Sequence, residues 1–440
     1  MTTHSSHARR DLGTKYRVLL DISQQISRSL DLQEVLDHLL LALRSVVDYD
    51  AAGIFVLNRN VPVARGAAVN LIDGMATVGF PGIPERDDPM LRSGKGIVGH
   101  VVSTGENIIA EDVSRDPHYI EGRAGTRSEI AVPIISNGAV IGALNLESDR
   151  LAAFSAADEE LLEAFAVAAA ISIQKAVLHR QVLDKQRIDQ QLKLAHEVQA
   201  GLLPAAAPAI PGYNIAGFNV PAWDIGGDYF DYLPLTGNRL GIVIADVSGK
   251  GLPAALLMAT FRAALRSEVR KDRPIPDVIN DVHGMLVESM DTSRFVTAVY
   301  GVLDPGPGTF TYINCGHCPP VLLRADGGRE VLSTGRTALG MFCGQSALTS
   351  TAHLLPGDTL LLYTDGVVEL TDSSDKEFGD ERLGRVLADC AARPAIEIIE
   401  TVLQAAHDHA GREHYDDDVT LVVVKRDPTS ALDALPTRSR

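Results

Sequence analysis

The sequence has little cysteine and a deficit of positive charge. Its 440 residues contain four cysteines, Cys315, Cys318, Cys343 and Cys390, all in the last third of the chain, which is not the pattern of a disulfide-stabilised secreted protein. Acidic residues outnumber basic ones, and the formal net charge is −17. A chain this acidic is a poor candidate for holding nucleic acid or an anionic membrane by bulk charge, so we expect neither as a partner.

Long apolar runs are also missing. The longest strongly apolar run, AFAVAAAISI (Ala164–Ile173), falls short of the roughly 20 residues that span a bilayer. The amino terminus, MTTHSSHARR, lacks the apolar core of a secretory signal. Hydrophobic residues make up 45% of the chain and charged residues 22%, which is the balance of a soluble globular protein. We expect a cytoplasmic protein of two or three domains without a transmembrane helix.

The first part of the chain alternates helical and strand-like segments. Apolar residues recur at helical spacing between Tyr16 and Leu43, and Asp31 is placed to cap the second half of this helix. Short β-rich runs follow, separated by Gly, Asn and Ser, and a helix is predicted from Ser155 to Ile173. The pattern indicates an α+β domain with an antiparallel sheet flanked by helices.

This region resembles a GAF sensor domain. The resemblance rests on GIVGHVVSTGENIIAEDV (Gly96–Val113), EIAVPIISNGAVIGALNLES (Glu129–Ser148) and FSAADEELLEAFAVAAAISI (Phe154–Ile173), in the order of the family. It covers about residues 17–176, after a flexible amino terminus at residues 1–16. Members of the family bind varied small molecules, so the resemblance leaves the ligand unknown. The region contains no cysteine, which argues against a thioether-linked bilin.

A helical linker is predicted next, over residues 177–207. The sequence is free of proline from Gln174 to Leu203, and an apolar seam runs along it, formed by Ile188, Leu192, Ala195, Val198 and Leu202. One interpretation is a parallel dimer helix that carries a signal from one domain to the next, and the other is a helix packed on its own domain. We expect the first, and hence a homodimer.

Carboxylates stand at the ends of apolar runs in the second half of the chain. Asp246 and Asp365 each end such a run, and the triplet Asp416–Asp418 precedes another. Asp228 follows two glycines in DIGGDYFDY. Carboxylates that cluster at a sheet rim need a cation to neutralise them, and oxygen ligands suit Mg²⁺ or Mn²⁺. Two such ions can activate a shared water for in-line attack on a phosphate.

The order of these segments resembles the SpoIIE/RsbU-type branch of the PPM metal-dependent serine/threonine phosphatases. The matching stretches are AHEVQAGLLP, GGDYFDY, IADVSGKGLPAALLMA, RFVTAVYGVLD, TYINCGHCPPVLLR, LLLYTDGVVE and DDDVTLVVV, spread over residues 195–425. The resemblance implies an αββα sandwich at residues 208–426, in which two antiparallel sheets pack face to face with helices outside. The tail at residues 427–440 is expected to be disordered.

The resemblance also implies a site for two Mn²⁺ or Mg²⁺ ions. Asp228 and Asp246 would be the central ligands and the catalytic pair. Val247 would contribute its backbone carbonyl, and Asp365 and Asp417 would complete the set.

Other residues around this site are expected to support it. Gly227, Asp231 and Asp418 would lie just outside the ligands. Ser248 stands where many relatives have a histidine that could protonate the leaving group, so this general acid is missing. Lys250 lies close by in the sequence, and no phosphate-binding arginine is evident.

The stretch NCGHCPPV (Asn314–Val321) contains a Cys-x-x-Cys pair. A thiol oxidoreductase places such a pair at the start of a helix, which lowers the thiol pKa. Here Pro319 and Pro320 follow, and then a strand-like run. The phosphatase family that this chain resembles has Asn-Ala-Gly-His-x-Pro at this place, so Cys315 stands where the family usually has alanine. We expect neither a redox nor a zinc role.

The resemblance as a whole implies a sensor-regulated, metal-dependent protein serine/threonine phosphatase. Its usual substrate in the family is a phosphorylated anti-sigma-factor antagonist with a STAS fold, in a partner-switching pathway, and here such a partner would act in trans. Two alternatives remain open. One is a non-catalytic module that binds a phosphoprotein, and the other is a thiol oxidoreductase built on Cys315 and Cys318.

Overall fold

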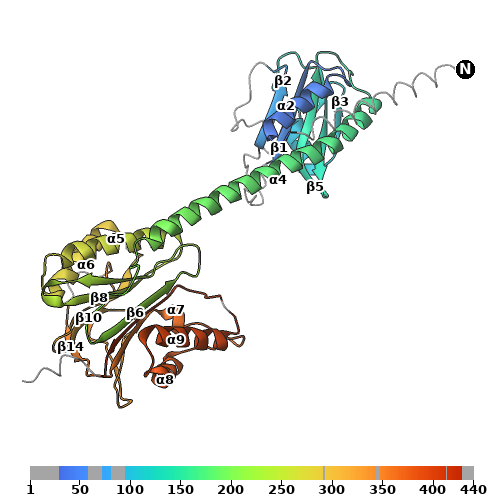
Figure 1. Ribbon diagram of the computed structural model, residues 1–440. Coiled ribbons are helices and arrows are strands. Elements are labelled where there is room, and N and C mark those ends of the chain that lie inside the picture. The colour runs from blue at the N-terminus through green and yellow to red at the C-terminus, as the bar shows by residue number, and fades with distance from the viewer. Residues whose placement is uncertain are drawn as a thin grey trace, which may run out of the picture. The chain divides into compact units, whose positions relative to one another are not determined.

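The computed structural model describes residues 29–57, 72–80, 95–290, 293–341, 347–412 and 414–428. The chain divides into two compact units, Met1–Ile188 and Asp189–Arg440 (Figure 1). Both combine helices with sheets, which confirms the predicted α+β class. Several sequence expectations lie outside the described residues: the helix expected before residue 29, the flexible terminus expected at residues 1–16, Cys343, and most of the tail expected to be disordered, from residue 429.

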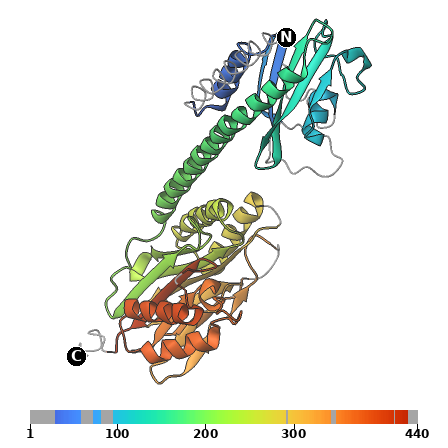
Figure 2. The same cartoon turned by 90° about the vertical axis from the view of Figure 1, so that its right-hand side faces the viewer.

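Unit 1 is built on a five-stranded sheet in the order β2-β1-β5-β4-β3, and all its pairs are antiparallel. The strands are β1 (Ala51–Leu57), β2 (Ile72–Val78), β3 (Ile108–Ala110), β4 (Ser128–Ser136) and β5 (Ala139–Ser148). Helices α2 (Leu32–Leu43) and α4 (Ala156–Ala200) pack on one face of the sheet and bury its main core (Figure 2). Asp31 caps α2, as predicted, by accepting the N–H of Glu34.

The other face of the unit 1 sheet carries a smaller core. Helix α3 (Gly96–Thr104) and the turn η2 (Val113–Arg115) pack there. Side chains along a strand alternate between the two faces of the sheet. Glu129, Asn145 and Glu147 therefore lie on this second face, because their strand neighbours Ile130, Leu144 and Leu146 belong to the main core.

Helix α4 is one continuous element of 45 residues. Its first turns bury Phe165, Ala169 and Ile173 in the unit 1 core. An 18-residue window of α4 has a mean hydropathy of 1.7, which by length and composition would suit a membrane span, but 50% of that window is buried inside the protein. Packing in the unit 1 core therefore accounts for the buried half of this window. Further along, Ile188 and Val198 of the predicted seam are 55% and 63% exposed.

Unit 2 contains two sheets. The first has the order β13-β10-β9-β8-β7, with β14 added on β10, and the second has the order β12-β11-β15-β16-β6. Their strands are β6 (Tyr213–Val220), β7 (Tyr229–Pro234), β8 (Leu240–Val247), β9 (Val296–Asp304), β10 (Thr309–Cys315), β11 (Val321–Leu323), β12 (Arg329–Val331), β13 (Gly335–Arg336), β14 (Ser350–His353), β15 (Thr359–Tyr363) and β16 (Val419–Arg426).

The two sheets of unit 2 pack face to face. Their inner faces share one core, to which Ile242, Ile244, Leu360 and Val422 contribute. Helices cover the outer faces (Figure 2): the first sheet packs on α5 (Leu252–Val269) and α6 (Ile275–Ser289), and the second on α8 (Asp380–Cys390) and α9 (Ala395–Ala410). The remaining helical segments are η3 (Thr236–Asn238) and α7 (Asp365–Val368). The layers follow the order helix, sheet, sheet, helix, which is the predicted αββα sandwich.

Candidate active site

Four of the predicted acidic residues lie at strand ends on the same side of the sandwich. In the first sheet, Tyr229 of β7 pairs with Ala245 of β8, and continuing this register by one residue sets Asp228 opposite Asp246. In the second sheet β15 pairs antiparallel with β16. Asp365 follows β15 and Asp417 precedes β16, so both lie at the same end of that sheet.

Asp228 joins the two sheets. Its side chain is buried, and its Oδ2 atom accepts two hydroxyl hydrogen bonds from the second sheet. Thr364, just after β15, donates at 2.8 Å, and Thr420 of β16 donates at 2.6 Å. Because both bonds go to the same oxygen, the other oxygen of Asp228 is left for a different partner.

Asp418 fastens the glycine turn that precedes Asp228. Its Oδ2 atom accepts the backbone N–H of Gly227 at 2.6 Å, and its Oδ1 atom accepts that of Ala222 at 2.9 Å. A Cβ at Gly226 would collide with the Asp418 carboxylate, and one at Gly227 would lie 2.8 Å from the Val247 carbonyl oxygen. The glycine pair therefore allows a close approach that no other residue type would permit.

The acidic residues at this end of the sandwich form a group that carries more negative charge than its surroundings neutralise. Burial, and then the charges of Asp246 and Asp418, raise the pKa of Asp228 well above its ordinary value. Burial, and then Asp365 and Asp417, raise the pKa of Asp246 to about 7. Burial and Asp417 also raise the pKa of Asp365. A cation among these carboxylates would relieve both the repulsion and the cost of burial.

Lys250 supplies one positive charge to this group. Its ammonium Nζ lies 2.9 Å from Asp417 Oδ2 and donates to the Asp416 carbonyl at 2.9 Å. In the part of the chain that the structure describes, no three carboxylate, imidazole or thiol groups converge closely enough to hold an ion as they stand. The oxygen-only donors, their raised pKa values and the ammonium beside Asp417 nevertheless fit the binding of divalent cations.

Asp231 does not join these carboxylates. It is buried on the side of β7 that faces α5, where it forms a two-pronged ion pair with Arg266 at 2.7 and 2.9 Å. The Tyr229 hydroxyl also donates to it. These contacts fix α5 to β7, so Asp231 stabilises the packing of this helix on its sheet and is not part of the acidic group.

The Cys-x-x-Cys stretch lies in a buried loop. Cys315 ends β10 and is fully buried, and no helix begins at either cysteine. Burial raises the pKa of Cys315 and of Cys318 to about 12, which leaves neither thiol reactive at neutral pH. Both are free cysteines in the structure. These observations oppose the oxidoreductase alternative.

His317, between the two cysteines, holds the loop. Its backbone N–H donates to the Asn314 side chain at 2.8 Å, and its ring Nδ1 lies 2.8 Å from the Thr297 hydroxyl. Burial lowers the pKa of His317 to about 4, so the ring is neutral at physiological pH.

Sequence reasoning missed the residues that connect the end of α4 to the site. The Gln199 amide donates to the Gly226 carbonyl at 2.6 Å and accepts the Gly226 N–H at 3.1 Å. One turn earlier, His196 lies 2.6 Å from the Asp224 carbonyl through its ring Nδ1. Both side chains therefore hold the loop that leads into Asp228. The apolar seam gave no signal for them, because they are polar.

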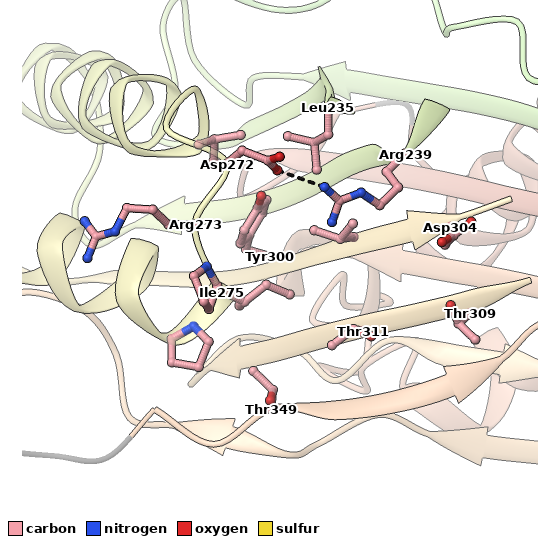
Figure 3. Close-up of a pocket in the computed structure, with 14 residues that line it drawn as sticks. Leu235, Arg239, Asp272, Arg273, Ile275, Tyr300, Asp304, Thr309, Thr311 and Thr349 are labelled. Atoms are coloured by element: carbon pink, nitrogen blue, oxygen red, sulfur yellow. Dashed lines mark hydrogen bonds and ion pairs between the residues drawn. The ribbon is translucent and has the colours of Figure 1, made fainter. Parts of the chain in front are cut away.

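A separate surface pocket of about 370 Å³ lies at the α5–α6 corner, beside β9 and β10 (Figure 3). None of the predicted site residues lines it. Its Arg239 forms an ion pair with Asp272 at 2.9 Å, and Arg273 pairs with Asp281 and Glu268. Because these cations already have acidic partners, neither offers a free positive charge to a ligand.

Comparisons with known families match both units. Residues 31–173 match the GAF domain, and residues 236–427 match the family described as stage II sporulation protein E (SpoIIE). The SiaA-PP2C domain of Pseudomonas aeruginosa, a solved structure, is similar in fold, with a TM-score of 0.50 and 22% identity over 56% of this chain and 99% of that one.

Curated relatives cover about half of the chain. Protein IcfG of Synechocystis sp. is 30% identical over 264 residues, which are 54% of this chain and 41% of IcfG. Phosphoserine phosphatase RsbU of Bacillus subtilis is 28% identical over 55% of this chain and 72% of its own length. Phosphoserine phosphatase RsbP of the same organism is 24% identical, over 53% and 57%. The chain thus spans less than two thirds of IcfG and of RsbP.

Proposed function

We propose that the chain is a sensor-regulated, metal-dependent phosphatase acting on phosphoserine or phosphothreonine in a protein. The match of residues 31–173 to the GAF family and of residues 236–427 to the SpoIIE family supports this proposal. The observation that carries this proposal is the set of carboxylates at one end of two packed sheets, with pKa values raised by burial and mutual repulsion. Such a set is costly in a folded protein unless a cation binds there.

The proposed ligands are Asp228 and Asp246 at the centre, the Val247 carbonyl, Asp365 and Asp417. Two Mg²⁺ or Mn²⁺ ions bound there would provide a water of lowered pKa and would neutralise the phosphate oxygens. Thr364 and Thr420 orient Asp228 from the second sheet, and its remaining oxygen is free to ligate. Lys250 would exchange its contact with Asp417 for one with solvent or substrate.

Among the described residues of the acidic group and its neighbours, we find no imidazolium placed to protonate the leaving alcohol. His317 is buried and neutral, and its ring is bound to Thr297. Ser248 stands where many PPM phosphatases, though generally not the SpoIIE-type ones, have a histidine, and its hydroxyl accepts the Phe295 N–H at 2.9 Å. The proton would then come from water in the site, and we expect a slow chemical step.

Control of the site by the GAF domain would act through α4. Gln199 and His196 hold the loop at Asp224–Gly226, and Arg262 of α5 donates to the Leu202 carbonyl at 2.7 Å. A shift of the last turns of α4 would move this loop and, with it, Asp228. Ligand binding that favours one position of α4 would therefore change the fraction of competent sites.

The proposed substrate is a phosphorylated STAS-domain antagonist of an anti-sigma factor, which would meet this chain in trans in the cytoplasm. The similarity to RsbU and RsbP, both named phosphoserine phosphatases, supports the phosphoprotein class. We also propose that the chain is a homodimer, joined along the exposed part of α4.

The test is hydrolysis of p-nitrophenyl phosphate and of a phosphoserine STAS protein with Mn²⁺, Mg²⁺ or EDTA. Activity should require metal and should fall below detection in Asp246→Asn. Asp416→Asn is the matched control, because its carboxylate is exposed and paired with Arg412, and it should keep wild-type activity. If the wild type binds the phosphoprotein but hydrolyses nothing with any metal, the chain is a binding module and the proposal is wrong.

A further inference from the structure

The surface pocket at the α5–α6 corner of unit 2 has a buried tyrosine in its floor. Tyr300 of β9 is 2% exposed, and no hydrogen bond joins its hydroxyl to any residue in the described part of the chain. Figure 3 shows this hydroxyl directed towards Asp272 and Arg239, which line the same pocket. Burial raises the pKa of Tyr300, so the hydroxyl stays protonated and remains a donor. A buried hydroxyl without a partner costs free energy, and a ligand with an acceptor would remove that cost.

Beside Tyr300 the pocket presents a donor and an acceptor together. Arg239 donates from Nη2 to Asp272 at 2.9 Å and from Nε to the Thr236 carbonyl at 3.1 Å. These bonds use Nε and Nη2, so the N–H groups on Nη1 remain for a ligand. The Asp272 carboxylate next to them is an acceptor. The edge of a nucleobase carries acceptors and donors side by side, and such an edge can pair with both groups.

The other end of the pocket floor carries a carboxylate. Asp304 and Tyr300 both lie on β9 and point to the same face of the sheet, with their Cα atoms about 13 Å apart along the strand. Within the described ranges Asp304 forms no ion pair, and its Oδ1 atom accepts the Gly306 N–H at 3.3 Å. Its cross-strand partner Thr309 also lines the pocket. A carboxylate in such a position can accept hydroxyl hydrogen bonds from a ribose, as the acidic residue of dinucleotide-binding folds does.

Apolar side chains line the pocket between these two ends. They are Leu235, Val269, Ile275 and Val302. Both arginines of the pocket, Arg239 and Arg273, are paired with carboxylates, and Asp304 adds a negative charge. A phosphate group would therefore be repelled without gaining a free cation, whereas an uncharged ring can bury its carbon atoms against the apolar side chains. The volume of about 370 Å³ lies in the range of small-molecule sites.

We propose that the pocket at the α5–α6 corner binds a nucleoside that carries no phosphate group. The edge of its base lies against Tyr300, Arg239 and Asp272, and its ribose hydroxyls donate to Asp304. The Tyr300 hydroxyl donates to an acceptor of the base. The acidic group lies towards the opposite end of β9, where Asp246 pairs with Thr297. The inference therefore concerns a second site, goes beyond the proposed phosphatase function and does not depend on it.

The test uses the full chain and does not measure phosphatase activity. The probes are adenosine, guanosine, cytidine and uridine, each compared with its 5′-monophosphate. At least one nucleoside should raise the unfolding temperature, and its monophosphate should raise it less. Calorimetry should then show that Tyr300→Phe weakens binding of that nucleoside about five-fold, and Asp304→Asn about ten-fold, since each loses a hydrogen bond. Tyr312→Phe is the matched control and should bind as the wild type does, because its ring packs in the core between the two sheets.

The Tyr300 hydroxyl also allows a measurement without any ligand. Because it has no partner in the fold, Tyr300→Phe should unfold at the same temperature as the wild type or at a higher one. A clear loss of stability in Tyr300→Phe would show that the hydroxyl is already bonded, and the proposal would then be wrong.

Three binding results would also overturn the proposal. One is that no nucleoside shifts the unfolding temperature. Another is that the monophosphates bind as tightly as the nucleosides, which would require a free cation. The third is that Tyr300→Phe or Asp304→Asn keeps full affinity while circular dichroism shows it folded, or that Tyr312→Phe loses as much affinity as they do. In that case the nucleoside binds elsewhere on the chain.

Discussion

Asp228 depends on two hydroxyl donors from the opposite sheet. In Thr420→Val the shape is kept but the 2.6 Å bond to Oδ2 is lost, and a carboxylate with one donor fewer is a weaker and less oriented ligand. We predict that the Mn²⁺ concentration for half-maximal activity rises about ten-fold, since a bond to a charged group is worth about 1.5–3 kcal/mol. Thr260→Val is the control, because that hydroxyl donates only within α5. An unchanged Mn²⁺ dependence would contradict the role of Thr420.

The raised pKa of Glu129 predicts that the stability of the fold depends on pH. Its pKa is about 8 in the folded protein and near 4.5 in the unfolded chain, so the folded state binds more protons between these values. The stability it contributes is present below the unfolded pKa and is lost as the pH rises through the folded pKa. Glu129→Gln has no carboxyl group to titrate at this position. Its free energy of unfolding, compared with that of the wild type, should therefore rise from pH 5 to pH 8. The charged or titratable groups around it are Glu147, Asp116, Tyr119 and Arg123.

Denaturant unfolding of unit 1 at several pH values measures this difference. Glu111→Gln, which removes an exposed carboxylate of the same unit, should follow the wild type throughout. If the difference between Glu129→Gln and the wild type stays constant with pH, Glu129 is ionised normally in the fold.

The end of α4 holds the loop before Asp228 by the two hydrogen bonds of Gln199. Gln199→Ala removes both bonds. We predict that kcat falls about thirty-fold in the full chain, because each hydrogen bond is worth about 1 kcal/mol and 1.36 kcal/mol corresponds to a factor of about ten. The KM for p-nitrophenyl phosphate should change little, because Gln199 contacts the loop and not the substrate. Gln191→Ala, an exposed position two turns earlier, is the control. Equal kcat in both variants would remove α4 from the control of the site.

Helix α5 is attached to β7 through the pair formed by Arg266 and Asp231. Arg266→Met leaves Asp231 buried without its cation, and we predict a loss of about 3 kcal/mol in the stability of unit 2. Urea unfolding measures this loss, with the exposed Arg270→Met as control. Folded Arg266→Met should keep its dependence on metal, because the pair lies outside the acidic group. A shifted metal dependence without a stability loss would place Asp231 among the supporting residues of the site after all.

Sequence patterns predicted the strand ends well, because an apolar run that stops at an Asp is a local feature. Asp246 and Asp365 could be placed in this way. The partners of Asp228 could not, since Thr364 and Thr420 reach it across the sandwich from positions 136 and 192 residues later. The pairing of Asp231 with Arg266 could not be predicted either, because the motif does not show which face of β7 Asp231 occupies.

The pair of Glu129 and Glu147 was missed for a related reason. Each looks like an ordinary charged residue at a strand end, and only the register between β4 and β5 brings them together. The sequence predicted helix on both sides of the domain boundary placed at residue 176, and α4 runs without interruption from Ala156 to Ala200.

For the molecule as a whole, the exposed apolar residues of α4 predict self-association. Val198 is 63% exposed, and burial against a second copy would remove it from water. Val198→Asp should shift the mass measured by light scattering from dimer towards monomer and change the basal activity. Gln190→Asp adds the same charge away from the seam and should leave both unchanged. A Val198→Asp variant that is still a fully active dimer would show that association does not use this seam.

The two hydrogen bonds to Oδ2 of Asp228 also affect which metal ion the acidic group would bind. With Oδ2 taken by two hydroxyls, Asp228 can offer an ion only one oxygen. Ca²⁺ favours high coordination numbers and often takes both oxygens of a carboxylate, whereas Mg²⁺ takes six ligands and keeps several waters. Two threonines that bind Asp228 from the opposite sheet would thus discriminate against calcium.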